Sequence, residues 1–296
     1  MPLEGFRPTI WSRQLIVDTD KAMVFGNIAN RNFEGEISGA GSVVKINEIG
    51  DITINDYTED GSITVQTLTD AQKELRINQN KYFAFAVDDV AKAQSNVEVM
   101  QAATLKAGHA RANNIDSYIA YRYVEAGVHD TSTLGTDVTT HQDVYAASGG
   151  NDGIIGVIAN MEIALNGADV PNSGRWIAWP SWGGGYLKYA GLVDNLAGAA
   201  KPQVLPNGNV GPGYIGNVAG FDHYVSNNVY NNGTAYAVMF GTYDAIAYAG
   251  QIMSIEAMRR ENYFQDMVRG LFVYGAKVVR PDNLGVAYLD PVGLSS

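Results

Sequence analysis

The sequence contains no cysteine, and this absence excludes several kinds of site at once. Without thiols there are no disulfides, no thiolate zinc sites and no cysteine nucleophile. The four histidines (His109, His129, His141 and His223) are scattered, and none stands at the spacing of a metal-ligand pair with another. We therefore interpret them as surface or hydrogen-bonded side chains, and we predict no metal site.

Charge and long apolar runs are also scarce. Charged residues make up 17% of the chain, against about a quarter in a typical protein. The largest basic cluster is the pair Arg259–Arg260, so the basic stripe of a sequence-specific nucleic-acid binder is missing. No run approaches about 18 apolar residues, and the N-terminus lacks the order of a signal peptide. We expect no membrane contact and assembly in a cytoplasm.

What the sequence does have is enough apolar material for a core. Hydrophobic residues are 46% of 296 residues, a length that predicts two lobes or one large elaborated domain. The 33 glycines indicate many turns. The net charge of −11 lies mostly in the N-terminal half, where residues 1–150 hold 20 acids and 12 bases.

Two N-terminal segments carry apolar residues without an evident partner. Residues 8–30 have a helix-like recurrence, and this arm must bury Trp11, Leu15 and Ile16 on some surface. Residues 42–80 alternate apolar and polar positions on either side of an acidic excursion, which predicts a long β-hairpin. An isolated hairpin is marginal in water. We expect arm and hairpin to pack on something else, such as another copy of the chain, with Ile63 and Val65 among the contacts.

The remaining pattern mixes helices and strands. Residues 90–126 predict a long helix that ends at Gly127 as its C-cap, and residues 152–170 predict a helix that stops at Asn166–Gly167. The segments 175–180 and 234–241 are typical of buried strands, and a late strand lies within 258–281.

A charged cluster precedes that late strand. Arg259, Arg260, Glu261 and Asp266 are predicted to lie in a helix and turn. They form either a solvated face with local ion pairs or an ion-pair patch between subunits.

For three short motifs we favour a structural interpretation over a functional one. "GPGYIG" (211–216) fits a dinucleotide-binding pattern, but turn formers precede it and no helix follows, so we predict a glycine-rich loop and no cofactor. "NGT" (232–234) is interpreted as a turn rather than a glycosylation site. No Gly-x-Ser-x-Gly elbow supports a hydrolase triad.

The pair Asp88–Asp89 follows the aromatic run 82–87. Two adjacent carboxylates could form a metal site or an acid–base pair. However, a helix is predicted to begin directly after them, and Asp is favoured at a helix N-terminus because it accepts the unpaired N–H groups there. We interpret Asp88 and Asp89 as a helix-capping junction, and we predict no catalytic residue.

Several long stretches resemble the major capsid (coat) proteins of tailed bacteriophages. They are "FRPTIWSRQLIVDTDKAMVFGNIANRNFEGEI", "GSVVKINEIGDITINDY", "LRINQNKYFAFAVDDVAKAQ" and "FQDMVRGLFVYGAKVVRPDNLGVAYL", in the order that the family has. The resemblance covers residues 6–290 and is least clear over 128–235.

The resemblance implies an α+β chain with the tailed-phage capsid fold, often called the Johnson fold. It implies an N-terminal arm (1–35) and an extended loop (36–81). It also implies a peripheral domain (82–149 and 256–296) with a spine helix over about 90–126, and an axial domain (150–255). The arm and the loop would reach onto neighbouring subunits, and Arg259 and Arg260 would be candidates for such contacts.

The function that the resemblance implies is structural: a subunit that self-assembles into an icosahedral virion shell around double-stranded DNA. Its partners would be many copies of itself in pentamers and hexamers, scaffolding and portal proteins, packaged DNA without sequence-specific contacts, and decoration proteins. Two alternatives stay open from the residues. One is an encapsulin-type compartment with the same fold, and the other is an enzyme with an unrecognised carboxylate site.

Overall fold

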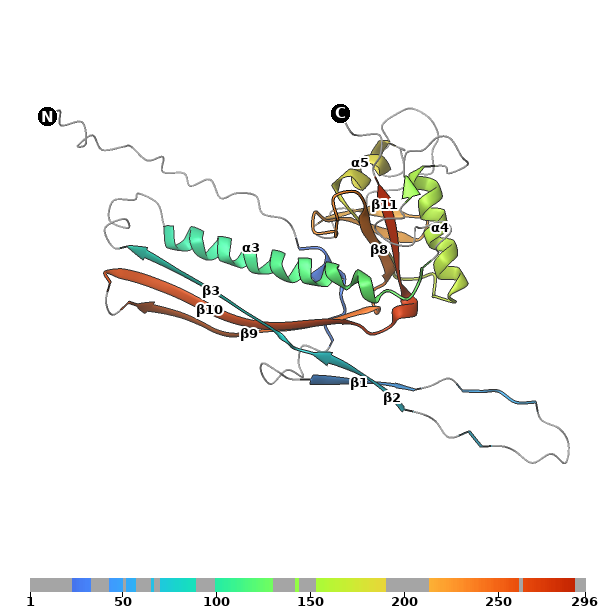
Figure 1. The fold of residues 1–296 in the computed structure, drawn as a ribbon, viewed down its shortest axis with the longest axis horizontal. Helices are drawn as coiled ribbons and strands as arrows, with labels where there is room; N and C mark the ends of the chain where they lie inside the picture. Colours follow the sequence, from blue (N-terminus) through green and yellow to red (C-terminus); the bar gives the residue numbers. More distant parts are fainter. Residues whose placement is uncertain are drawn as a thin grey trace.

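The computed structural model describes residues 23–32, 43–49, 52–56, 65–66, 70–88, 99–129, 142–143, 153–189, 213–260 and 263–290. Figure 1 shows a long helix lying along a sheet of long strands, a compact lobe beside it, and a strand pair that projects away from both. Trp11, Leu15, Ile16, Ile63 and Asp89 lie outside the described residues. Within the described ranges no helix is both long and apolar enough to cross a membrane.

The compact lobe is built on a six-stranded sheet. Its order is β4-β11-β8-β5-β7-β6, with β5 parallel to β7 and β11 parallel to β4. The predicted buried strand at 175–180 is confirmed, because every residue of β5 is buried. The strands are β4 (Gln142–Asp143), β5 (Arg175–Trp179), β6 (Tyr214–Val218), β7 (Phe221–Val225), β8 (Tyr236–Thr242) and β11 (Leu284–Asp290).

Helices cover both faces of this sheet, which explains the unbroken apolar run of β5. On one face lie α4 (Ile154–Gly167) and α5 (Ser181–Tyr189), whose side chains share a core with Ile177 and Trp179. The predicted stop of α4 at Asn166–Gly167 is confirmed. The other face packs against the short α1 (Phe25–Ile28) and the long α3 (Val99–Ala120) through Trp176.

The long sheet has three antiparallel strands in the order β3-β10-β9. They are β3 (Gln79–Asp88), β9 (Ile246–Arg259) and β10 (Gln265–Val278). The helix and turn predicted around Arg259 to Asp266 is therefore wrong: Arg259 ends one strand and faces Asp266 in the next. Residues such as Glu256, Met258 and Arg259 suit a helix by propensity, but pairing along the whole of β10 overrides that preference.

The long helix is confirmed from Val99 onward; residues 89–98 lie outside the described ranges. Its C-terminal end differs from the prediction. A 3₁₀ turn, η3 (Tyr121–Glu125), closes the helix, and Ala126 leaves it in an extended conformation, so Gly127 is not a C-cap. A Cβ at Gly127 would stand 2.7 Å from the carbonyl carbon of Pro281, in the 3₁₀ turn η4 (Pro281–Asn283). Gly127 is needed for this close approach of two backbones.

The predicted β-hairpin is present as an antiparallel pair, β1 (Val43–Ile49) with β2 (Asp70–Arg76). Its base is anchored because Val44, Leu75 and Ile77 form a small core with residues of β9 and β10. Lys73 Nζ also donates a hydrogen bond of 2.7 Å to the carbonyl oxygen of Val279. Farther out, Ile52, Ile54 and Val65 are 70%, 94% and 86% exposed, so these three described side chains bury little of their apolar surface.

Candidate functional site

In the part of the chain that the structure describes, no three or more His, Asp or Glu residues lie close enough to share a metal ion. Two buried polar groups, His223 and Asp116, stand out instead, and each has a complete set of hydrogen-bond partners that explains its burial.

His223 on β7 is fully buried in the compact lobe. The indole N–H of Trp179 donates to its Nδ1 at 2.8 Å, so Nδ1 must be unprotonated, and Nε2 donates to the carbonyl oxygen of Val218 at 3.2 Å. The two rings are nearly parallel, with an interplanar angle of 8° and centres 6.2 Å apart, as the in-plane hydrogen bond between them requires. Burial lowers the pKa of His223 to about 4, and a proton on Nδ1 would face the indole N–H. His223 is a neutral structural histidine rather than a proton shuttle.

Asp116 is a fully buried carboxylate near the C-terminal end of α3. Its Oδ1 accepts the backbone N–H groups of Val24 (2.9 Å) and Gly26 (3.1 Å), at the N-terminus of α1. Its Oδ2 accepts the Asn228 side-chain amide at 2.9 Å and the Ser226 hydroxyl at 3.4 Å. Burial raises the pKa of Asp116, and these hydrogen bonds oppose the rise. The carboxylate thus joins α3, the N-terminal segment and the 226–228 loop at one point.

The junction predicted at Asp88 and Asp89 is described only on its strand side. Asp88 is the last residue of β3, opposite Gln265 of β10. Asp89 and the first residues of the expected helix lie outside the described ranges, so helix capping by this pair stays a prediction.

The glycine motif leads into a strand and not into a helix. Gly213 has φ +80°, a conformation that favours glycine, and β6 follows at once and pairs with β7. A Cβ at Gly213 would stand 2.5 Å from the carbonyl oxygen of Val225. A dinucleotide fold places a helix N-terminus after this loop, and here a strand occupies that place. The turn predicted at Asn232–Thr234 is confirmed, with the Gly233 N–H donating to Asn231 Oδ1 at 2.7 Å.

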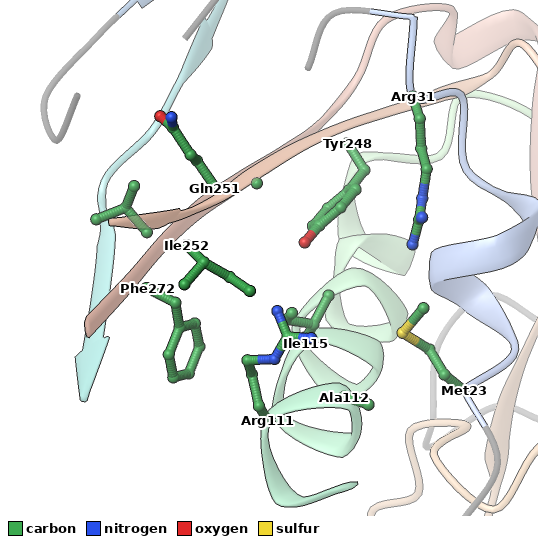
Figure 2. A pocket seen from close by; sticks show the side chains of 11 residues that line it. Met23, Arg31, Arg111, Ala112, Ile115, Tyr248, Gln251, Ile252 and Phe272 are labelled. Carbon is green, nitrogen blue, oxygen red and sulfur yellow. The ribbon is translucent and has the colours of Figure 1, made fainter. Parts of the chain in front are cut away.

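A groove of about 460 Å³ lies between α3, the segment before α1 and the edge of β9. Figure 2 shows Arg31 and Arg111 reaching toward this space from opposite sides, with Tyr248 and Ile252 on the strand side. Arg31 is fixed by a hydrogen bond from its Nε to the Gly26 carbonyl oxygen and lies over the Tyr248 ring at 5.5 Å. The described lining has no carboxylate and no histidine, so it offers contact surface and positive charge but no acid–base pair.

The tip of the β9–β10 hairpin carries the predicted arginines. Residues 251–259 of β9, an edge strand, are all exposed. Arg259 forms an ion pair with Asp266 at 3.9 Å, and the Arg260 guanidinium lies 4.2 Å from the centre of the Tyr263 ring. Phe264 is 78% exposed beside them. An unpaired edge with exposed aromatic and aliphatic side chains is suited to contact with another protein surface.

No family model and no curated protein matches the sequence. Solved structures do match. A chain from Mycobacterium phage Che8 is 29% identical, with a TM-score of 0.74, over 99% of this chain and 100% of that chain. The capsid of cyanophage P-SCSP1u matches with a TM-score of 0.68 at 15% identity, over 96% and 93% of the two chains. The capsid of Ralstonia phage GP4 matches with a TM-score of 0.65 at 16% identity, over 98% and 97%.

The chain has the fold of a phage capsid protein. The mixed helices and strands of the capsid fold confirm the α+β class that the sequence predicts. Two features of this capsid fold were missed by the sequence-based interpretation, namely the Asp116 junction and the Trp179–His223 pair. Both depend on residues far apart in sequence, 92 residues between Asp116 and Val24 and 44 between Trp179 and His223.

Proposed function

We propose that this chain is the structural subunit of a tailed-phage capsid, and that many copies assemble into an icosahedral shell around double-stranded DNA. The observation that carries the proposal is the match along nearly the whole of both chains to the Che8 structure and to two phage capsids. Nothing among the described residues favours an encapsulin-type compartment or an enzyme.

The described elements support a division of the subunit into a peripheral and an axial domain. α3 would be the spine helix, and it would form the peripheral domain with β3, β9 and β10. The six-stranded sheet with α4 and α5 would form the axial domain. Since β11 belongs to this sheet, we place residues 284–290 with the axial domain and not with the peripheral one.

The projecting β1–β2 pair would be the extended loop that lies on a neighbouring subunit. Its exposed Ile52, Ile54 and Val65 support this role, because the subunit alone leaves them in water. The N-terminal arm (1–35) would reach onto a neighbouring subunit, with Trp11, Leu15 and Ile16 as its contacts. Arg259 and Arg260, at an exposed hairpin tip, would meet another subunit. Other partners would be scaffolding, portal and decoration proteins and the packaged DNA, with assembly in the host cytoplasm.

The test separates assembly from folding. Val65→Lys should leave the free energy of unfolding of the isolated subunit within about 0.5 kcal/mol of wild type, because the side chain is 86% exposed. It should nevertheless prevent particles from forming, as judged by sedimentation and electron microscopy. Asn55→Lys, which adds the same charge at an exposed polar position of the same loop, is the matched control and should assemble. A wild-type chain that stays a monomer or small oligomer under assembly conditions would refute the proposal.

A further inference from the structure

The groove between α3 and β9 is also the place where the described part of the chain begins. Met23 is the first described residue, and it lines the groove. Its carbonyl oxygen accepts the side-chain amide of Asn27 at 2.9 Å, and the Val24 N–H donates to the buried carboxylate of Asp116 at 2.9 Å. The chain before Met23 therefore starts from a fixed point at the rim of the groove.

Two guanidinium groups face this groove, that of Arg111 from α3 and that of Arg31 from the segment after α1 (Figure 2). The hydrogen bond to Gly26 and the contact with the Tyr248 ring hold Arg31 in its orientation, so little side-chain entropy is lost when an anion binds. Arg111 is half-buried, and within the described ranges no carboxylate forms an ion pair with it. The groove is therefore suited to an anionic group, which can accept charge-assisted hydrogen bonds from both arginines.

The nearest acidic residues before Met23 are Asp18 and Asp20, in the sequence DTDKAM (18–23). Both lie outside the described residues. Three residues of extended chain span at most about 11 Å and five span at most about 18 Å, so either carboxylate can reach a groove that Met23 itself lines. In an extended segment alternate side chains share a side, so Asp18 and Asp20 would point together and Lys21 would point the other way.

We infer that residues 18–20 dock in the groove of their own subunit, with the carboxylate of Asp20 between the guanidinium groups of Arg31 and Arg111. Hydrogen bonds between two charged groups are stronger than those between neutral groups. A carboxylate on so short a tether also has a local concentration on the order of millimolar or higher, which favours it over an acidic segment of another subunit. The inference goes beyond the proposed function, because it concerns the single subunit before assembly.

Docking in this groove determines where the rest of the arm starts. Only residues before Asp18 then remain to contact a neighbouring subunit, and they include Trp11, Leu15 and Ile16. Trp11 lies seven residues before Asp18, so it could contact surfaces within about 25 Å of the docked segment.

Disulfide trapping tests the docked position in the unassembled subunit. The chain has no cysteine, so Asp18→Cys and Ala112→Cys introduce the only thiols, one in the segment and one in the groove lining. With oxidised glutathione, this pair should form a disulfide about tenfold faster than Asp18→Cys with Leu105→Cys, at a more exposed position of α3 outside the described lining. The rate should not depend on subunit concentration, because both thiols belong to one chain.

A double-mutant cycle on the Asp18→Cys, Ala112→Cys pair tests the charges. Asp20→Asn and Arg111→Gln should each slow disulfide formation by about tenfold, and the two together should slow it no more than Asp20→Asn alone, because they remove the same interaction. Lys106→Gln, which removes a cation from α3 outside the described lining, is the matched control and should change the rate by less than about twofold. Urea unfolding of each variant checks that the subunit is folded.

The results separate this inference from the proposed function. Equal rates for the Ala112→Cys and Leu105→Cys partners, a rate that rises with subunit concentration, or independent effects of Asp20→Asn and Arg111→Gln would each overturn the docking. None of these results would touch the capsid function, because they are obtained before assembly. Failure of the wild-type chain to form particles would refute the capsid function and leave the docking intact.

Discussion

Acidification should weaken the compact lobe through one residue, His223. In the folded subunit burial lowers the pKa of His223 to about 4, whereas an unfolded histidine titrates near 6.5. The unfolded state therefore binds the proton more readily. The contribution of His223 to stability is complete above about pH 6.5 and is lost as the pH falls toward the folded pKa. The geometry explains the low pKa, because a proton on Nδ1 would place two N–H groups against each other, that of His223 and the indole N–H of Trp179.

The difference between the two pKa values sets the size of the effect. At 1.36 kcal/mol for each pKa unit, the free energy of unfolding should fall by about 3 kcal/mol between pH 7.5 and 4 on account of His223. Urea unfolding of the unassembled subunit at a series of pH values measures it. Tryptophan fluorescence reports on this lobe, because Trp176, Trp179 and Trp182 all lie in its cores.

The variant His223→Gln isolates the contribution of the histidine. Glutamine does not titrate, and its oxygen and amide can replace the acceptor and donor of the ring. The carboxylates titrate in both proteins. Asp116, whose pKa is raised and whose contribution therefore has the opposite sign, is also common to both and cancels in the comparison. Wild type should lose about 3 kcal/mol more than the variant on acidification. Equal pH dependence in the two proteins would refute the reasoning.

Two further predictions concern the junctions of the fold, and both are measured by urea unfolding of the subunit. Gly127→Ala should lower the free energy of unfolding by about 2 kcal/mol or more, because the new Cβ would stand 2.7 Å from the Pro281 backbone. The control Gly108→Ala, in open space within α3, should raise it by about 0.5–1 kcal/mol. Equal effects of the two substitutions would count against the close approach. Asp116→Ala should lower the free energy of unfolding by about 3 kcal/mol, because it leaves buried N–H donors unpaired. The control Asp282→Ala, at an exposed position, should change it by less than about 0.5 kcal/mol. An Asp116→Ala variant as stable as wild type would contradict the junction.

The sequence predicts well those elements whose pattern has one physical meaning. The apolar run of β5 is too short for a helix and too continuous for an exposed strand, so a buried strand is its simple interpretation. The stop of α4 is equally local, because Asn166 and Gly167 end a helix wherever it packs. The β1–β2 pair follows from the partial alternation of apolar and polar residues in the two segments.

The wrong predictions concern residues whose structure depends on contacts with residues far away in the sequence. The residues around Arg259 suit a helix by propensity, and the ladder with β10 overrides that preference and selects the strand. Gly127 looks like a C-cap because glycine commonly ends helices, but its role is set by Pro281, more than 150 residues away. The candidate interface residues are not tested by the fold of one subunit. Exposure of Val65 and of the Arg259 side chain agrees with an interface, but the surface that they would contact belongs to another copy. Their roles therefore stay predictions.

The Asp116 junction has a consequence for the order of folding. Its donors come from sites 92 and 112 residues away, in the segment at α1 and in the 226–228 loop. We expect contacts between such distant parts of a chain to form late, because closing a long loop lowers the entropy of the chain before the contact contributes any favourable free energy. The α1 segment therefore has no complete binding site until α3 and the compact lobe are both in place. We expect docking of this segment to follow the folding of α3 and of the compact lobe.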